Sequence, residues 1–491
     1  MSTLVGMPVT TQKGLRWKKD RSSGVMPEWT TDPSIEDITT LVRRELKIPP
    51  SEPCVVQFLT QNSFNKDYTV TCGSGQEYIL RLTVPVDPGS KTMSEVATMK
   101  YLRHDTEVPV PQIFCHQAST DNELGLEWIL MTRMPGRKLS DEWEGMDYLK
   151  KEQLVREMAS VHAQLFQQRF DQLGNLYPAN ELPHLCTPGL EDIALLTLEA
   201  SILSQHVGLG KIVSAPFFWG AHIDHNVPRG PYKRSQDWLA AQLQLNLLDL
   251  NDESKLETSD EIKRSIYQNI IDSYPGEPDE AATTIWKKQI DGMNTAPHLK
   301  YAREKVEEGK RRAQRLLDLM PKIFPEKEDE EEVFVLHHHS LHASNILVDP
   351  NGSLTGISSW ECTHTAPLWH ACQLPSFLDL TDSTAAVFAY LNIEYVNEEH
   401  KTQKKLRQFF LEEMQRICPG WVEVHKASQL KVGFEQCVQH FGKAGDGKWI
   451  DRWIEGVEKE GSKTLLKEIV RAEWVRDYVH GNAYPFGSGL L

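Results

Sequence analysis

Short apolar runs and helical apolar stripes alternate along the chain and divide it into two parts. Between residues 54 and 133 the runs are short and bounded by polar turns, as in antiparallel strands. They are CVVQFL, DYTVTC, QEYILRLTV, residues 112–118 and residues 126–133. Apolar residues recur at helical spacing over 91–103 and over 34–46. The pattern predicts a small sheet lobe accompanied by two helices.

Beyond Leu139 the spacing becomes helical, starting with a core helix over 150–170. A long segment of about residues 204–298 then interrupts the pattern with an aromatic loop and two helices, near 238–250 and 262–274, and we interpret it as an insertion. Further predicted helices cover 300–319 (closed by Pro321), 385–391, 398–417, 432–441, 449–457 and 463–478. The chain is therefore predicted to be α+β, with an irregular arm over 1–33, a sheet lobe over 34–136 and a mainly helical lobe over 137–491. Trp17 and Trp29 are candidate anchors of the arm.

The stretch EVFVLHHHSLHASNILVDPNGSLTGISSWEC, residues 332–362, carries the densest candidate chemistry. Its apolar runs 333–336, 346–348 and 354–357 predict three short strands. Pro350-Asn351-Gly352 supplies the tight turn that a hairpin between the last two requires. Polar side chains therefore gather on two connections, 337–345 and 358–361.

Composition excludes several classes of partner. The formal charge of −16 at pH 7 argues against nucleic acid, because phosphate binding requires a basic face. No apolar stretch is long enough to span a bilayer, so we expect no membrane partner. The eight cysteines are dispersed without metal-like spacing, which favours reduced thiols, a cytoplasmic location and no metal site. A small-molecule substrate is the remaining expectation.

Residues 332–362 resemble the aminoglycoside-phosphotransferase-like proteins of filamentous fungi, members of the protein-kinase-like superfamily. Their segment has the form HHxDLxxxNILVDxxGxLTGxxDWEC, and it aligns here without a gap through Asn345 to Val348 and Trp360 to Cys362. The resemblance implies a bilobal fold with a nucleotide cleft between the lobes. It places a catalytic Asp at Ser340, a Mg²⁺-binding Asp at Ser359 and a second metal ligand at Asn345. Both carboxylates are hydroxyls in this chain.

The sheet lobe shares further positions with these proteins. Asn62 stands where relatives have Gly in the nucleotide-covering loop, and Phe64 starts the shared FNKxY sequence. The resemblance makes Arg81 the cation that holds nucleotide phosphates and Glu95 its helix partner. The segment ending at Met131 matches the hinge, where an adenine would bind to backbone groups.

Candidate catalytic groups are therefore the side chains on the two connections. They are His338, His339, Ser340, His342, Ser359 and Glu361. A serine cannot act as a carboxylate base at neutral pH, and Mg²⁺ prefers anionic oxygen. The histidines either act as acids and bases on a ligand or hold the loop by hydrogen bonds. Candidate substrate-pocket residues are Phe217, Phe218, Trp219 and Trp360, with anchoring of the insertion on the core as the alternative.

Three hypotheses remain open from the sequence. The first is a kinase-fold enzyme repurposed for non-phosphoryl chemistry on a small molecule of fungal secondary metabolism, without a cofactor. The second is a residual ATP-dependent small-molecule phosphotransferase that still uses Mg²⁺, with an acid near Asn345. The third is a noncatalytic pseudokinase that serves as a binding module.

Overall fold

The computed structural model describes residues 10, 12–20, 24–73, 75–181, 207–252, 256, 259–272, 274, 278–325, 331–378, 394–442 and 447–460. The start of the insertion and the helices predicted over 385–391 and 463–478 lie outside these residues. All structural statements below concern this part of the chain.

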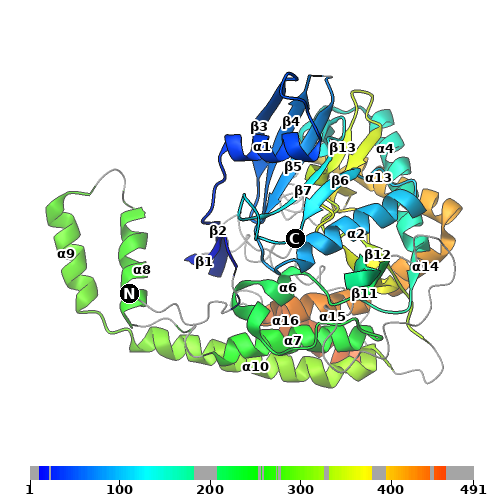
Figure 1. Ribbon diagram of the computed structural model, residues 1–491. Coiled ribbons are helices and arrows are strands. Elements are labelled where there is room, and N and C mark those ends of the chain that lie inside the picture. The colour runs from blue at the N-terminus through cyan, green and yellow to red at the C-terminus, as the bar shows by residue number, and fades with distance from the viewer. Residues whose placement is uncertain are drawn as a thin grey trace.

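The first lobe is built on a five-stranded antiparallel sheet, as the alternating runs predict. Its order is β3 (Cys54–Gln61), β4 (Asn65–Cys72), β5 (Glu77–Thr83), β7 (Glu127–Thr132) and β6 (Ile113–Gln117). Helix α1 (Ile35–Glu45) begins after Ser34, whose hydroxyl accepts from the Asp37 N–H and caps the helix. Helix α2 (Ser90–Asp105) packs against the sheet and faces the second lobe (Figure 1).

The predicted irregular arm is wrong for residues 15–20 and 24–29. These residues form a hairpin of β1 (Leu15–Asp20) and β2 (Gly24–Trp29). Leu15 and Trp17, two residues apart and so on one face of β1, are both buried. The Trp17 ring packs edge-on against Trp219 of the insertion, with centroids 5.3 Å apart. Cross-strand pairing and this burial order the arm, a combination that a search for long apolar runs overlooks.

The central stretch forms the predicted strands in the second lobe. β13 (Ile346–Val348) and β14 (Leu354–Ile357) make the expected hairpin, which β8 (Arg137–Lys138) extends. β12 (Phe334–His337) instead lies between β15 (His364–Pro367) and β9 (Arg169–Phe170). A further pair joins β10 (Asn175–Pro178) to β11 (Val207–Gly210). Both polar connections therefore run between these two small sheets, 337–345 from β12 to β13 and 358–361 from β14 towards β15.

Helices form the remainder of the second lobe. In chain order the described ones are α3 (Leu139–Glu142), α4 (Tyr148–Gln167), α6 (Ala215–Phe218), α7 (Ser235–Asn251), α8 (Ser259–Asp272), α9 (Glu280–Asp291), α10 (Ala296–Ile323), α11 (Leu368–Ala371), α13 (Glu394–Ile417), α14 (Pro419–Ala427), α15 (Gln429–His440) and α16 (Gly447–Glu460). α8 and α9 project from the body beside the start of α10 (Figure 1). α10 continues through Pro321, contrary to the prediction, because a proline in the last turn removes only one hydrogen bond. Among the described helices, none is long and apolar enough to cross a membrane.

Candidate functional site

His338 holds the first polar connection in place. Its Nδ1 accepts from the Ser340 backbone N–H at 3.1 Å, so its Nε2 carries the proton and faces the Ser358 carbonyl, also at 3.1 Å. Its ring lies edge-on against Trp360, with centroids 4.4 Å apart. Burial lowers the pKa of His338 to about 4. Both ring nitrogens are engaged, so His338 positions the loop as a neutral group.

Ser340, His339 and His342 lie at the accessible end of the same loop. The Asn345 side-chain amide donates to the Ser340 carbonyl at 2.8 Å and lies 3.3 Å from His342 Nε2. His339 and His342 are exposed, and the Ser340 side chain makes no hydrogen bond within the described residues. Burial lowers the pKa of His342, although the charge of Glu361 opposes the shift. A neutral imidazole and a free hydroxyl are therefore available at this surface.

The second polar connection has an unusual backbone. Ser359 and Cys362 have φ of 63° and 61°, a left-handed conformation that costs a non-glycine residue about 1 kcal/mol or more. Asp and Asn occupy this conformation more readily than Ser. The turn at Ser359 therefore suits an aspartate, although the side chain present is a hydroxyl.

Glu361 points from this turn to the cation of the sheet lobe. Its carboxylate accepts from Arg81 Nη1 at 3.2 Å and from the Asn65 side-chain amide at 2.8 Å. Arg81 also donates from Nη1 to Glu95 at 2.6 Å and from Nε to Asp67 at 3.0 Å. The Arg81 side chain is only 6% exposed. The predicted Arg81–Glu95 pair is present in the structure, and two further carboxylates share its cation.

These five residues, with Lys91, form a buried ionic cluster. Lys91 is fully buried, with Nζ 3.1 Å from the Asn65 side-chain oxygen and 3.9 Å from Glu95. The cluster contains two cations and three carboxylates, those of Asp67, Glu95 and Glu361. Burial raises the pKa of Glu95, and the charge of Glu361 adds to the shift while Arg81 opposes it. Burial disfavours the ionised form of Glu361 too, but Arg81 and Lys91 outweigh it and lower the pKa of Glu361.

The loop that would cover a nucleotide is closed by its own side chains. Asn62 Oδ1 accepts from the backbone N–H groups of Phe64 at 2.8 Å and Asn65 at 2.7 Å. Such N–H groups are the donors with which a loop of this kind binds phosphate. Asn62 is not among the described non-glycine residues with positive φ, so the site does not need a glycine backbone. The Phe64 ring packs edge-on against Phe218 and Trp219, at 5.5 and 5.9 Å, which fixes the loop to the insertion.

The predicted aromatic pocket residues lie in packed surroundings. Phe217 and Phe218 are 0% exposed, and Trp360 is 1% exposed with its indole N–H donating to the Ile357 carbonyl at 2.8 Å. Trp219 is partly buried and donates to the Val25 carbonyl at 2.7 Å. Met131 of the hinge is buried in β7. The aromatic loop therefore anchors the insertion on both lobes, which is the alternative interpretation of its composition.

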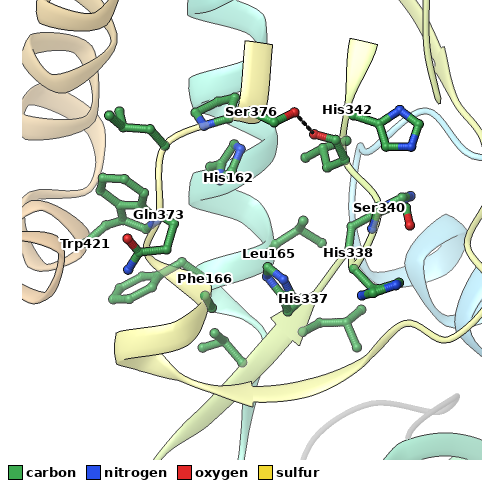
Figure 2. A pocket seen from close by; sticks show the side chains of 17 residues that line it. His162, Leu165, Phe166, His337, His338, Ser340, His342, Gln373, Ser376 and Trp421 are labelled. Carbon is green, nitrogen blue, oxygen red and sulfur yellow. Dashed lines mark hydrogen bonds between the residues drawn. The ribbon is translucent and has the colours of Figure 1, made fainter. Parts of the chain in front are cut away.

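A cavity of 220 Å³ opens beside the first polar connection, between that loop, α4 and residues 371–376. Figure 2 shows His162 reaching into it from α4, with His337, His338 and Ser340 on the opposite side. The rest of the lining is largely apolar and includes Leu165, Phe166 and Trp421. The insertion aromatics do not line it. The cavity is thus a second place for a small molecule, separate from the cluster around Arg81.

Magnesium and nucleotide phosphates do not fit the described groups well. The positions at Ser340 and Ser359 offer hydroxyls, and Glu361 is directed to Arg81 and Asn65 instead of an open site. Arg81 is surrounded by carboxylates, and the loop donors are taken by Asn62. No group of three or more potential metal ligands gathers within the described residues.

The sequence analysis missed four contributors to these sites: Asn65, Asp67, Lys91 and His162. Asp67 lies directly opposite Arg81 in the β4–β5 register, and Lys91 is one helical turn before Glu95. Both relations could be read from the predicted elements once their register is known. His162 lies next to Val161 in the apolar stripe of α4, where a single polar residue is the only signal.

Comparison with known proteins places this arrangement in context. Residues 55–255 match the model of the phosphotransferase enzyme family. This match and the observed topology give the chain the kinase-like fold of aminoglycoside phosphotransferases, with an antiparallel sheet lobe and a mainly helical lobe. Among solved structures, it is similar to the streptomycin–ATP ternary complex of APH(2″)-IIa, with TM-score 0.41 and 11% identity over 92% of this chain and 100% of that one. Apo APH(4)-Ia, as a thermostable mutant, gives TM-score 0.38 and 12% identity over 87% and 100%.

Fungal proteins are among its sequence relatives. A subtelomeric hrmA-associated cluster protein of Aspergillus fumigatus is 29% identical over 181 residues, which are 36% of this chain and 33% of the relative. Altered inheritance of mitochondria protein 9, mitochondrial, of Yarrowia lipolytica is 22% identical over 214 residues, 40% of this chain and 36% of the relative. The chain therefore spans only about a third of the length of these curated relatives.

Proposed function

We propose that this phosphotransferase-like protein no longer transfers phosphate and instead acts on a small molecule at the loop of His338 to His342, without ATP or Mg²⁺. The observation that carries the proposal is the set of ion pairs that Arg81 already forms. A cation that should receive nucleotide phosphates already contacts the carboxylates of Asp67, Glu95 and Glu361. An anionic triphosphate placed there would meet a buried cluster whose three carboxylates outnumber its two cations, Arg81 and Lys91, and repulsion in such a site is poorly screened.

The chemistry that remains is acid–base chemistry at the loop surface. His342 is exposed and has a lowered pKa, so it is largely neutral at pH 7. Its Nε2 accepts from the Asn345 amide, so in this proposal it takes up a proton at that nitrogen once the substrate displaces the amide. Ser340 offers a free hydroxyl two residues away, and the Asn345 side-chain amide contacts the Ser340 backbone carbonyl and His342 Nε2. In this proposal His338 and Trp360 keep the loop in shape and do not touch the substrate.

A role in fungal secondary metabolism is part of the proposal. It is supported by the similarity to a protein named for its place in a subtelomeric cluster, a similarity that covers a third of that protein. Action in the cytoplasm stays a prediction from the sequence.

The second candidate is a residual ATP-dependent phosphotransferase. The Arg81–Glu95 pair, the hydrogen bond from Asn345 to the Ser340 carbonyl, and the aspartate-compatible backbone of Ser359 favour it. These features keep the backbone and side-chain arrangement of a phosphotransfer site, although Ser340 and Ser359 stand where the resemblance implies aspartates.

Mass spectrometry of a fungal small-molecule extract incubated with the purified chain separates these functions. We expect a compound to be consumed in the presence of EDTA and apyrase, and His342→Gln to abolish its consumption. His104→Gln, a change at an exposed histidine of α2, is the matched control and should retain activity. A product that has gained a phosphoryl group from ATP would instead establish the second candidate. An extract left unchanged under all conditions would favour a noncatalytic binding module.

A further inference from the structure

Two cysteines face each other at the end of the β3–β4 hairpin opposite its turn. Cys54 is the first residue of β3 and Cys72 is the last residue of β4, and the antiparallel register pairs them directly. Residues paired in this way point to the same face of a sheet. Both side chains therefore lie at the margin of the first-lobe core, on the face that packs with α1. Neither thiol is in a disulfide.

The hydrogen bonds of Cys72 show how closely the two residues approach. Its backbone N–H donates to the Gln76 carbonyl at 3.0 Å, and its carbonyl accepts from the Gly75 N–H at 2.9 Å. Both backbone groups therefore point toward β5 and away from β3. Cys54 and Cys72 are thus a non-hydrogen-bonded pair, in which Cα atoms lie about 4.5 Å apart and the side chains are close. A disulfide requires Cα atoms about 4.4–6.8 Å apart, so this pair is within its range.

The chain around the pair is tightly packed. A Cβ atom added to Gly73 would lie 2.9 Å from both Glu52 and Pro53, so the end of β4 touches the segment that leads into β3. Arg43 of α1 holds that segment, because its guanidinium donates to the carbonyls of Pro49 at 3.0 Å and Glu52 at 2.9 Å. The fold itself therefore holds the two thiols side by side, which favours a reaction between them over reactions with other thiols.

The pair is accessible from one side. Cys54 is partly exposed whereas Cys72 is only 8% exposed, so Cys54 is the thiol that a reagent in solution meets first. Cys372 and Cys418 also share a core cluster, in the second lobe, but both are buried. Among the described cysteines, the Cys54–Cys72 pair therefore combines register with access.

The strand that begins at Cys54 is an exposed edge. Among the described strands, only β4 pairs with β3, which forms the outer edge of the sheet (Figure 1). The sequence of β3, CVVQFLTQ, contains no charged residue, and Val55, Phe58 and Leu59 are about half exposed, at 50%, 55% and 46%. An uncharged apolar edge strand tends to pair with other chains when it frays. A covalent bond at its first residue would oppose that fraying.

We propose that Cys54 and Cys72 form a reversible redox site, at which a disulfide oxidant such as oxidised glutathione cross-links β3 to β4. The Cys54 thiolate attacks one sulfur of the oxidant, which forms a mixed disulfide and releases one glutathione. The Cys72 thiolate then attacks the Cys54 sulfur and releases the second glutathione. Two protein thiols lose two electrons to one glutathione disulfide, and their protons pass to the two glutathione thiols. The site lies outside the loop of His338 to His342 and does not depend on the proposed function.

The reaction should be slow at neutral pH. Burial raises the pKa of both thiols. For Cys54 the charge of Arg43 opposes the shift, and for Cys72 the Cys54 thiol and Glu52 add to it. The thiolate is the attacking species, so the rate of cross-linking should rise about tenfold from pH 7 to pH 8.

Peptide mapping by mass spectrometry tests the site on the purified full chain, kept folded at pH 8 with excess oxidised glutathione. We expect a linked pair of peptides that contain Cys54 and Cys72, and its loss on addition of dithiothreitol. Cys54→Ser should abolish this link. Cys115→Ser is the matched control, because it removes a partly exposed thiol from β6 of the same sheet and should retain the link. The amide hydrogens of β3 should exchange more slowly in the oxidised chain than in the reduced chain.

Several outcomes would overturn the assignment. They are a link that forms only after unfolding in urea, a glutathione adduct on Cys54 that Cys72 does not resolve, and links between other cysteines at equal yield. If Cys54→Ser does not fold, the parent chain still decides, because its rate of cross-linking should differ about tenfold between pH 7 and pH 8. An equal rate at the two pH values would contradict attack by a buried thiol. None of these measurements contains ATP or a substrate, so failure of the proposed function would leave the result unchanged.

Discussion

Replacing Glu361 by glutamine tests the buried ionic cluster with a minimal change of shape. The carboxylate accepts from Arg81 and from the Asn65 amide through different oxygens. An amide has one oxygen and one donor group, so one of these two hydrogen bonds must be lost and a donor must face a donor. A hydrogen bond to a charged group contributes about 1.5–3 kcal/mol.

Part of this loss is offset, because Glu361 also repels Glu95 and contributes to its raised pKa. We therefore expect Glu361→Gln to lower the free energy of unfolding by about 1–2 kcal/mol at pH 7. The folded-state pKa of Glu361 is lowered, so its contribution is complete above the unfolded value of about 4.3 and disappears as pH falls through the folded value. The deficit of the variant should thus be constant from about pH 5 to 7 and shrink below about pH 4.

Urea unfolding followed by circular dichroism measures this difference. Glu77→Gln is the matched control, because Glu77 pairs with Arg133 at 3.0 Å on the surface and its loss should change stability by no more than about 0.5 kcal/mol. A Glu361→Gln protein as stable as the parent at pH 7 would refute the cluster as described. The same variant distinguishes the functions: loss of Mg²⁺-dependent ATP binding on this change would identify Glu361 as a substitute metal ligand.

Three further predictions address the same elements. Burial raises the pKa of Glu127 to about 7 despite its hydrogen bonds to the start of α2, so the free energy of unfolding should fall as pH rises from about 4.3 to 7. Glu127→Gln should flatten this dependence of the unfolding free energy on pH, measured by urea unfolding at pH 5 to 8. An unchanged dependence would contradict the raised pKa of Glu127. Asn62→Gly combined with Glu361→Gln should gain calorimetrically detectable ATP binding, since the loop N–H donors are freed and Arg81 loses one of its three carboxylates; a double variant as inert as the parent would refute internal occupation of the site. Trp360→Ala should destabilise by about 3–5 kcal/mol in urea, because its ring is buried beneath His338, and a loss below about 1 kcal/mol would show that it is not core.

The sequence predicted the elements with a clear apolar period. The strands of the first lobe, α2, α4 and the β13–β14 hairpin all follow from local patterns and turn residues. The β1–β2 hairpin and the passage of α10 through Pro321 did not follow, because they depend on tertiary burial and on position within the last helical turn. Short strands such as β15 depend on pairing partners far away in the chain.

Residues of the candidate site could be predicted only where the family motif specifies which residue stands at a position. The pairing of Arg81 with Glu95 and the grouping of Ser340, His342 and Asn345 could be expected from the resemblance. The second role of Glu361 could not, because a hydrogen bond across 280 residues depends on how the lobes meet. The hydrogen bonds that Asn62 Oδ1 accepts within its own loop could have been predicted, since Asn side chains commonly accept from backbone N–H groups two residues ahead.

Calorimetric titration of ATP into the purified chain, with and without Mg²⁺, tests the central claim most directly. With Arg81 held by three carboxylates and the loop donors taken by Asn62, we expect no saturable heat at concentrations up to about 1 mM, the top of the usual range for enzyme substrates. Saturable binding that requires Mg²⁺ would contradict the account and show that the cleft between the lobes still receives a nucleotide.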